Sequence, residues 1–280
     1  MTTYIIGIGL IGGSFALSLR EHNISNKILG YDASAQNLKR AVELGLIDQA
    51  ADIDEGVAQA DLILLATPVD ITPILATKIL NKVRPNQIVI DMGSIKEELC
   101  EVISMHAKRD QFVATHPMWG TENSGPEAAE KGAFKGRTVV ICEKDRSNSA
   151  AVEKMEQIYT TLGMPIIYMN AEEHDLHVAY ISHISHITSF ALALTVLEKE
   201  REEQHIFALA GGGFESTVRL AKSSSSTWIP ILMRNKYNVL DVLREHIHQL
   251  QVMRKAIEAD DKEALIKMMS KANSIKKIIE

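Results

Sequence analysis

Residues 1–14, Met1-Thr-Thr-Tyr-Ile-Ile-Gly-Ile-Gly-Leu-Ile-Gly-Gly-Ser14, decide the fold of this chain. A short apolar run predicts a buried strand, the glycines fit G-x-G-x-x-G, and apolar residues at helical spacing follow them. In this geometry one glycine permits the tight turn, one lets the backbone approach a pyrophosphate, and one lets the helix pack against the strand. The helix N-terminus then offers free N–H groups to the phosphates. We therefore expect a dinucleotide to contact Gly7, Gly9, Leu10, Ile11 and Gly12.

The acidic residue Asp32 follows this turn at the spacing of a ribose-binding carboxylate. Asp32 ends a second apolar run, twenty residues past Gly12, where a carboxylate can accept hydrogen bonds from the adenosine ribose hydroxyls. Because a carboxylate repels a 2′-phosphate, the sequence predicts NAD rather than NADP. The alternative is an ordinary strand–turn–helix that binds no ligand.

The first part of the chain alternates short apolar runs with amphipathic stretches. Buried strands are expected at 61–67, 87–92, 112–115, 138–142 and 165–169, with helices at 33–44, 71–83, 95–107 and 148–162. Repeated strand–helix units predict parallel strands joined by right-handed crossovers. The predicted fold class is α/β, with a Rossmann dinucleotide-binding domain at 1–169 and an all-helical domain at 170–280.

Composition limits the possible partners of the chain. The 280 residues carry a net charge of −6, which provides no electrostatic footprint for nucleic acid or an anionic membrane. No apolar run reaches the ~18 residues that cross a bilayer, and a strand starting next to Met1 leaves no room for a targeting peptide. The two cysteines, Cys100 and Cys142, form no C-x-x-C pair. We expect a cytoplasmic protein.

The helix expected at 176–197 is apolar over most of its circumference. Such a helix is normally buried on nearly all sides. A domain of ~110 residues is too small to bury it alone. The sequence therefore predicts a homodimer through the helical domain.

Ligands of open α/β sheets bind beyond the carboxyl ends of the strands. The loops Thr67-Pro68, Gly93-Ser94 and His116-Pro117 follow expected strands and should face one crevice with the glycine turn. His116 would then lie at the nicotinamide end, where an imidazole can accept a hydroxyl proton as the carbon gives up hydride. Ser94 can hydrogen-bond the histidine or the substrate oxygen. The alternative is a structural histidine.

Four histidines occur within residues 174–186. On an α-helix, His183 would point nearly opposite to His174, so the four cannot share one metal ion, and no metal site is expected. Ser182 and His186 lie four residues apart on one face of an otherwise apolar helix. We expect them to contact a polar substrate, the alternative being hydrogen-bonded core residues.

A third cluster follows the glycines 211–213. Three glycines permit a backbone bend, and the short helix after them carries Arg219 between apolar neighbours. Arginine is suited to bidentate binding of a carboxylate. Arg234 and Lys236, further along, have the character of surface charges.

Together these stretches resemble the prephenate/arogenate dehydrogenase family of tyrosine biosynthesis. The resemblance rests on Gly7–Ser14, Asp91-Met-Gly-Ser94, His116-Pro-Met-Trp-Gly120, Ser182-His183-Ile-Ser-His186, and Gly211-Gly-Gly-Phe214 through Lys222, in family order over about three quarters of the chain. It implies NAD(P)-dependent oxidative decarboxylation. It also implies a catalytic His116 with Ser94 as its partner, and substrate contacts from Ser182, His186, Gly213 and Arg219. Thr67 and Pro68 are expected to line the cofactor.

The resemblance leaves the substrate open between prephenate and arogenate. Glu122, Glu127 and Glu130, in the loop after Trp119, could favour the amino group of arogenate, and we expect prephenate. Two rivals are a β-hydroxyacid dehydrogenase and a non-enzymatic NAD-sensing protein. The first would place a catalytic lysine on the interdomain helix, but residues 171–198 contain none. Because the sequence stops at Glu280, no regulatory domain is expected, and any tyrosine inhibition would act at the active site.

Overall fold

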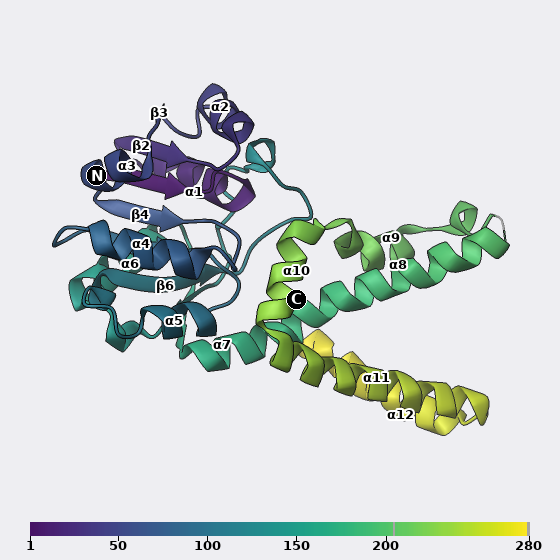
Figure 1. Cartoon of the computed structure of the whole chain (residues 1–280). Helices are drawn as coiled ribbons and strands as arrows, with labels where there is room; N and C mark the ends of the chain where they lie inside the picture. Colours follow the sequence, from purple (N-terminus) through teal and green to yellow (C-terminus); the bar gives the residue numbers. More distant parts are fainter. Residues whose placement is uncertain (204, 279–280) are drawn as a thin grey trace. The chain divides into compact units, whose positions relative to one another are not determined.

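The computed structural model describes residues 1–203 and 205–278 (Figure 1). By packing, the chain divides into two compact units, Met1–Asn235 and Lys236–Glu280. The second unit contains α11 (Lys236–Glu258), α12 (Lys262–Ala272) and a closing 3₁₀ turn at Asn273–Lys277. The last two residues of the predicted helical domain, Ile279 and Glu280, lie outside the described residues.

An eight-stranded sheet forms the centre of the first unit, in the order β3-β2-β1-β4-β5-β6-β7-β8. The strands are β1 (Thr2–Ile6), β2 (Lys27–Tyr31), β3 (Gln49–Ala50), β4 (Leu62–Leu65), β5 (Ile88–Asp91), β6 (Phe112–Pro117), β7 (Val139–Cys142) and β8 (Ile166–Met169). β1 lies between β2 and β4 and is parallel to both. The strand order therefore reverses beside β1, which is where this class of sheet binds its ligand.

Two strands, β7 and β8, depart from the predicted all-parallel pattern, because they are parallel to each other but run opposite to the rest of the sheet. β7 runs antiparallel to β6, whereas the alternating pattern predicts parallel neighbours. The connection between them, residues 118–138, is fully described and contains a single 3₁₀ turn, Pro126–Ala128, rather than a crossover helix. Without a helix to carry the chain back across the sheet, the chain reverses direction and pairs as a neighbour.

Helices cover both faces of the sheet, which confirms the doubly wound α/β fold. The helices packed on one face are α1 (Leu10–Glu21), α2 (Ala35–Glu43) and α6 (Ser149–Thr161), and their core includes Phe15 and Tyr159. The helices packed on the other face are α3 (Ile53–Gln59), α4 (Thr72–Lys82) and α5 (Glu97–Ile103), with a core that includes Ile79 and Leu99. The central strands are buried on both faces, as their continuous apolar runs predict.

From Ala171 onward the described residues form helices and turns, as predicted. The elements of the first unit are α7 (Ala171–Val178), a π-helical turn (Ala179–His183), α8 (Ile184–Glu202), a 3₁₀ turn (Phe207–Leu209), α9 (Gly212–Val218), a 3₁₀ turn (Arg219–Lys222) and α10 (Ser225–Arg234). The Asn170 side chain caps α7 by accepting a hydrogen bond from the Glu173 N–H at 2.7 Å.

The π-helical turn corrects one expectation from the sequence. A π-turn inserts one residue, so side chains after it are rotated by roughly 100° from their α-helical positions. The α-helical angle used to place His183 relative to His174 therefore does not apply, and both side chains are buried. Asn235 links Asp175 on α7 with His183 in the π-helical turn. Its side-chain amide contacts the Asp175 carbonyl oxygen at 2.7 Å and His183 Nδ1 at 3.2 Å.

Helix α8 is largely uncovered by its own chain. Ser189 is its one buried residue, and the Leu194 and Leu197 side chains are 59% and 50% exposed. Among the described residues, the continuous helix Ala171–Glu202 is the one long and apolar enough, on length and composition alone, to span a bilayer. The same surface would suit a second protein chain.

Candidate active site

The glycine turn after β1 has the geometry that its sequence predicts. Gly7 adopts a positive φ of 92°, and a Cβ there would lie 2.4 Å from the Ala66 carbonyl oxygen. A Cβ on Gly12 would lie 2.1 Å from the Gly7 carbonyl oxygen, whereas one on Gly9 would meet nothing within 4 Å. The chain itself therefore requires Gly7 and Gly12, and Gly9 faces open space at the start of α1.

The residues around this open space fit a dinucleotide. Leu10 and Ile11 begin α1, where first-turn N–H groups have no partner within the helix. The Asp32 carboxylate accepts hydrogen bonds from the Ile8 N–H and the Ser34 N–H, both at 2.9 Å. These bonds fix the carboxylate and leave further lone pairs for ribose hydroxyls.

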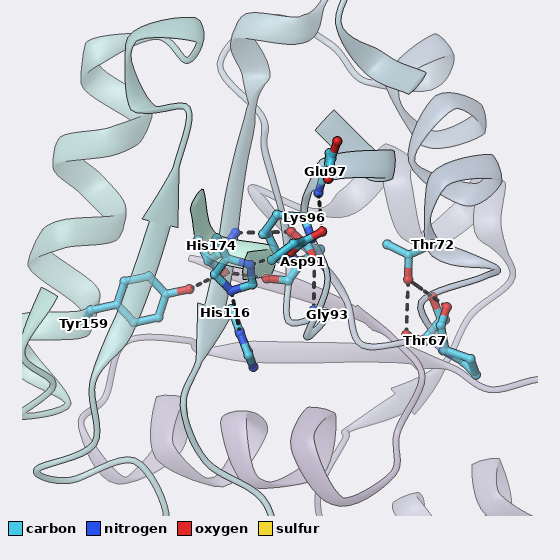
Figure 2. A network of polar contacts seen from close by, with 12 residues as sticks. Thr67, Thr72, Asp91, Gly93, Lys96, Glu97, His116, Tyr159 and His174 are labelled. Atoms are coloured by element: carbon cyan, nitrogen blue, oxygen red, sulfur yellow. Dashed lines mark hydrogen bonds and ion pairs between the residues drawn. The ribbon is translucent and has the colours of Figure 1, made fainter. Parts of the chain in front are cut away.

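The loop after β4 forms the neighbouring edge of this space. The hydroxyls of Thr67 and Thr72 lie 2.9 Å apart, and the Thr72 hydroxyl lies 3.0 Å from the Pro68 carbonyl oxygen (Figure 2). Because β1 and β4 are adjacent, this loop lies beside the glycine turn, as the cofactor prediction requires.

Two glycine substitutions should separate binding from folding. Gly9→Ala adds a methyl group into open space, so we expect an unchanged melting temperature but NAD affinity weakened by about tenfold or more, since the methyl group occupies the pyrophosphate position. Gly12→Ala should destabilise the fold by about 1–3 kcal/mol through overpacking. Thermal melts and NAD titrations check both. A Gly9→Ala variant with normal NAD affinity would remove Gly9 from the cofactor site.

His116 lies near the carboxyl end of β6 and is joined to a buried pair on α7. Its Nδ1 lies 2.8 Å from Nε2 of His174, and His174 Nδ1 lies 2.7 Å from Oδ1 of Asp175 (Figure 2). His174 and Asp175 are fully buried. No pattern in the sequence connects these two residues with His116. The signal available was a His-Asp pair at the start of the first helix after the sheet.

A buried ion pair fixes the loop that carries Ser94. The ammonium of Lys96 is paired with the Asp91 carboxylate, and both side chains are inaccessible to solvent. Asp91 also accepts hydrogen bonds from the Gly93 N–H at 2.9 Å and the Thr115 N–H at 3.2 Å. This network ties β5, β6 and the loop between β5 and α5 together beside His116. A carboxylate ending an apolar strand was the sequence signal for it.

Ser94 is placed in this loop, half-buried, after β5. In the part of the chain that the structure describes, its hydroxyl makes no hydrogen bond. His116 Nδ1 is engaged by His174, so Ser94 remains available to the other imidazole nitrogen or to a substrate oxygen. Its role stays a prediction.

The electrostatic environment keeps His116 neutral. Burial, followed by the unfavourable interaction of a protonated imidazole with His174 and Lys96, holds the pKa of His116 well below its ordinary value of 6.5. Burial likewise lowers the pKa of His183 to about 4. At pH 7 the His116 imidazole therefore has a lone pair that can accept a proton.

Ser182 lies in the π-helical turn and His186 in the first turn of α8, and both are half-buried. His186 Nδ1 lies 3.1 Å from the Ser182 carbonyl oxygen, and its ring stacks on Trp228 with centroids 3.4 Å apart. Burial lowers the pKa of His186, and the Arg219 charge lowers it further. These contacts leave the His186 Nε2 atom for a ligand.

Among the described residues, no group of three or more His, Cys, Asp or Glu side chains could hold a metal ion.

Arg219 meets the loop after Trp119. Its guanidinium lies 2.7 Å from the Glu122 carboxylate, whose side chain is 22% exposed. Glu127 instead pairs with Arg40 of α2 at 2.9 Å, and the Glu130 N–H donates to the Ser14 hydroxyl at 2.9 Å. The three glutamates therefore do not form one acidic gate, and Glu122 is the one that reaches a predicted substrate residue.

Gly213 occupies the first turn of α9 and is exposed. A Cβ there would meet nothing within 4 Å. Its predicted substrate contact therefore stays a prediction.

Two family models match the chain. The prephenate dehydrogenase nucleotide-binding domain matches residues 15–168, and the prephenate dehydrogenase dimerization domain matches residues 170–271. Together they span both the sheet and the helical part of the chain.

Individual relatives agree with the models. The chain is 31% identical to a prephenate dehydrogenase of Bacillus subtilis, over 97% of this chain and 74% of the relative. It is 30% identical to a cyclohexadienyl dehydrogenase of Zymomonas mobilis, over 94% and 90% respectively. A crystal structure of prephenate dehydrogenase from A. aeolicus, in complex with hydroxyphenyl propionate and NAD+, superposes with a TM-score of 0.90 at 29% identity, covering 100% of this chain and 98% of that one. The chain therefore belongs to the prephenate dehydrogenase family of NAD-dependent oxidoreductases.

Proposed function

We propose that this enzyme converts prephenate to 4-hydroxyphenylpyruvate and carbon dioxide in the cytoplasm, with His116 as the proton acceptor. The observation that supports this role is the engagement of His116 Nδ1 by His174. It leaves Nε2 as the acceptor atom, close to the strand ends where ligands of such sheets bind.

The proposed reaction requires the protein to orient the substrate and to accept and return one proton. Bound NAD supplies the hydride acceptor. His116 Nε2 takes the proton from the ring hydroxyl as hydride leaves the same carbon, and a ring ketone forms. Loss of carbon dioxide then makes the ring aromatic, and the proton returns to the ring oxygen. Aromatisation supplies the driving force, so substrate orientation and a neutral base are the main requirements.

Arg219 and His186 are the proposed contacts for the anionic substrate. Arg219 offers a charged, planar donor set for a carboxylate. His186 is held by the Ser182 carbonyl and by Trp228, so its orientation is defined before substrate binds. Local cations of this kind are needed because the protein as a whole is acidic.

Arogenate is the second candidate substrate. It carries an amino group in place of the keto group of prephenate, and Glu122 is the acidic side chain that would favour it. Because Glu122 is already paired with Arg219, its charge is largely satisfied within the protein. This pairing supports prephenate as the preferred substrate.

Product stoichiometry tests the proposed reaction. With prephenate and NAD, we expect equal amounts of NADH, carbon dioxide and 4-hydroxyphenylpyruvate. NADH without carbon dioxide would indicate simple alcohol oxidation, as in a β-hydroxyacid dehydrogenase. NAD binding with no product would instead indicate an NAD-sensing protein.

We further propose that residues 170–280 form the substrate-binding and dimerisation domain, next to the Rossmann domain at 1–169. The exposed leucines of α8 and the match to a dimerization-domain model support this. Light scattering should give twice the chain mass of 31.0 kDa.

Leu194→Glu should shift that mass toward the monomer, because a charge would be buried between two copies. Met105→Glu, at a side chain 91% exposed in the sheet domain, is the matched control and should stay dimeric. A monomer mass at every concentration of the unmodified protein would contradict the homodimer.

A further inference from the structure

The hydrogen-bonded chain His116–His174–Asp175 has a direction that the surrounding groups fix. The Asp175 carboxylate accepts hydrogen bonds from the backbone N–H groups of Lys96 at 2.8 Å and Glu97 at 2.9 Å. Each carboxylate oxygen therefore already accepts one backbone hydrogen bond. An ionised carboxylate can only accept, so Nδ1 of His174 must carry the hydrogen that points at Asp175.

The position of the hydrogen on His174 determines the position of the hydrogen on His116. Burial lowers the pKa of His174, so the ring is neutral and has one hydrogen, on Nδ1. Its Nε2 is then a bare acceptor, 2.8 Å from His116 Nδ1. His116 must therefore donate from Nδ1, which leaves Nε2 unprotonated. The two rings meet at 70° with centroids 5.0 Å apart.

The groups that hold this chain come from several elements. Backbone N–H groups at the start of α5 fix the Asp175 carboxylate, and the Asn235 amide donates to the Asp175 carbonyl. Other titratable groups near the chain include the paired Lys96 and Asp91, His183, Glu97 and the buried Cys142. Asp175 thus occupies a fixed position before any ligand binds.

We propose that Asp175 and His174 are positioning residues that hold His116 as the Nδ1–H tautomer, so that Nε2 is the proton acceptor. When Nε2 takes the substrate proton, the new positive charge on His116 is shared through Nδ1–H with the His174 lone pair, and Asp175 supports His174 from behind. The proton stays on His116 until it returns to the ring oxygen. This inference rests on the proposed function, since it assumes that His116 accepts a proton.

Asp175→Asn tests the proposal with almost no change of shape. Both carboxylate oxygens accept hydrogen bonds from the start of α5, Oδ1 from the Lys96 N–H and Oδ2 from the Glu97 N–H, so the amide loses one of these bonds in either orientation. When its NH₂ takes the Oδ1 position, it faces His174 Nδ1 as a donor. His174 must then carry its hydrogen on Nε2 and donate to His116 Nδ1, which places the His116 hydrogen on Nε2 and removes the acceptor. We expect kcat to fall by about 10²–10⁴-fold, with NAD affinity within about threefold of the unmodified enzyme. Glu173→Gln, an exposed neighbour on α7, is the control and should retain full turnover.

Nitrogen NMR of ¹⁵N-histidine-labelled protein reads the tautomer directly. In the unmodified enzyme, His116 Nε2 should give a pyridine-like signal and Nδ1 a pyrrole-like one; Asp175→Asn should exchange them. A merely structural role for Asp175 would not produce this exchange.

Each outcome of these experiments decides the proposal. A folded Asp175→Asn enzyme in which the His116 nitrogen signals are exchanged but kcat is unchanged would overturn it. If the variant melts early or keeps the original His116 signals, the spectrum of the unmodified enzyme decides, because a pyrrole-like Nε2 on His116 would equally overturn the proposal. Failure of the proposed function would look different: His116→Asn itself would leave turnover unchanged.

Discussion

The His116→Asn variant is expected to lose about 10³–10⁴-fold of kcat, the upper part of the range for removal of a general base. Asparagine has no basic nitrogen, so nothing at this position could take the hydroxyl proton. The substitution lies outside the glycine turn, and NAD affinity should therefore stay within about twofold. Steady-state turnover and an NAD titration on the same preparation measure both quantities.

The pH profile of the unmodified enzyme provides the companion measurement. A base must be unprotonated to act, so activity is lost as the pH falls through its pKa. Since burial and neighbouring charges depress the pKa of His116, the acid limb of kcat/KM assigned to this base should lie below pH 6.5. Unchanged turnover in His116→Asn would refute the assignment of the base.

Arg219→Gln is expected to raise the KM for prephenate by about 10²–10³-fold while kcat changes by only a few fold. Removal of one partner from a charge-assisted contact costs about 2–5 kcal/mol. The loss falls mainly on KM because the guanidinium binds the substrate carboxylate equally before and during the reaction. Initial rates over a wide range of prephenate concentration separate the two parameters.

Arg234→Gln is the matched control for this experiment. Arg234 is also an exposed arginine of the first unit with a glutamate partner, Glu98, but it is not one of the residues proposed to contact the substrate. Its removal should leave the KM for prephenate unchanged. A normal KM in Arg219→Gln would exclude Arg219 from the site, and equal effects in both variants would indicate a general electrostatic contribution.

Local sequence signals were sufficient for most of the fold. The glycine turn and the continuous apolar runs of the central strands depend on residues close in sequence, and both agree with the structure. The direction of β7 was predicted wrongly because residues 118–138 contain a loop where the pattern implied a crossover. Strand direction depends on that connection, which apolar spacing does not reveal.

The candidate site was only partly accessible from the sequence. His116 followed from the rule that parallel strands end at a common edge. The contact with His174 did not, because it joins residues 58 positions apart. The α-helical angle used to place His183 does not apply for a local reason, since a π-helical turn, Ala179–His183, interrupts the α-helix. Arg219 and Glu122 lie 97 positions apart, and no periodic pattern in the sequence relates them.

The most direct test of the account is kcat/KM of the unmodified enzyme for prephenate and for arogenate, measured with NAD under identical conditions. NADH can form from both substrates, but we expect a clearly higher kcat/KM for prephenate, because Glu122 is already paired with Arg219. A higher value for arogenate would contradict the proposed substrate. No NADH from either compound would contradict the proposed function as a whole.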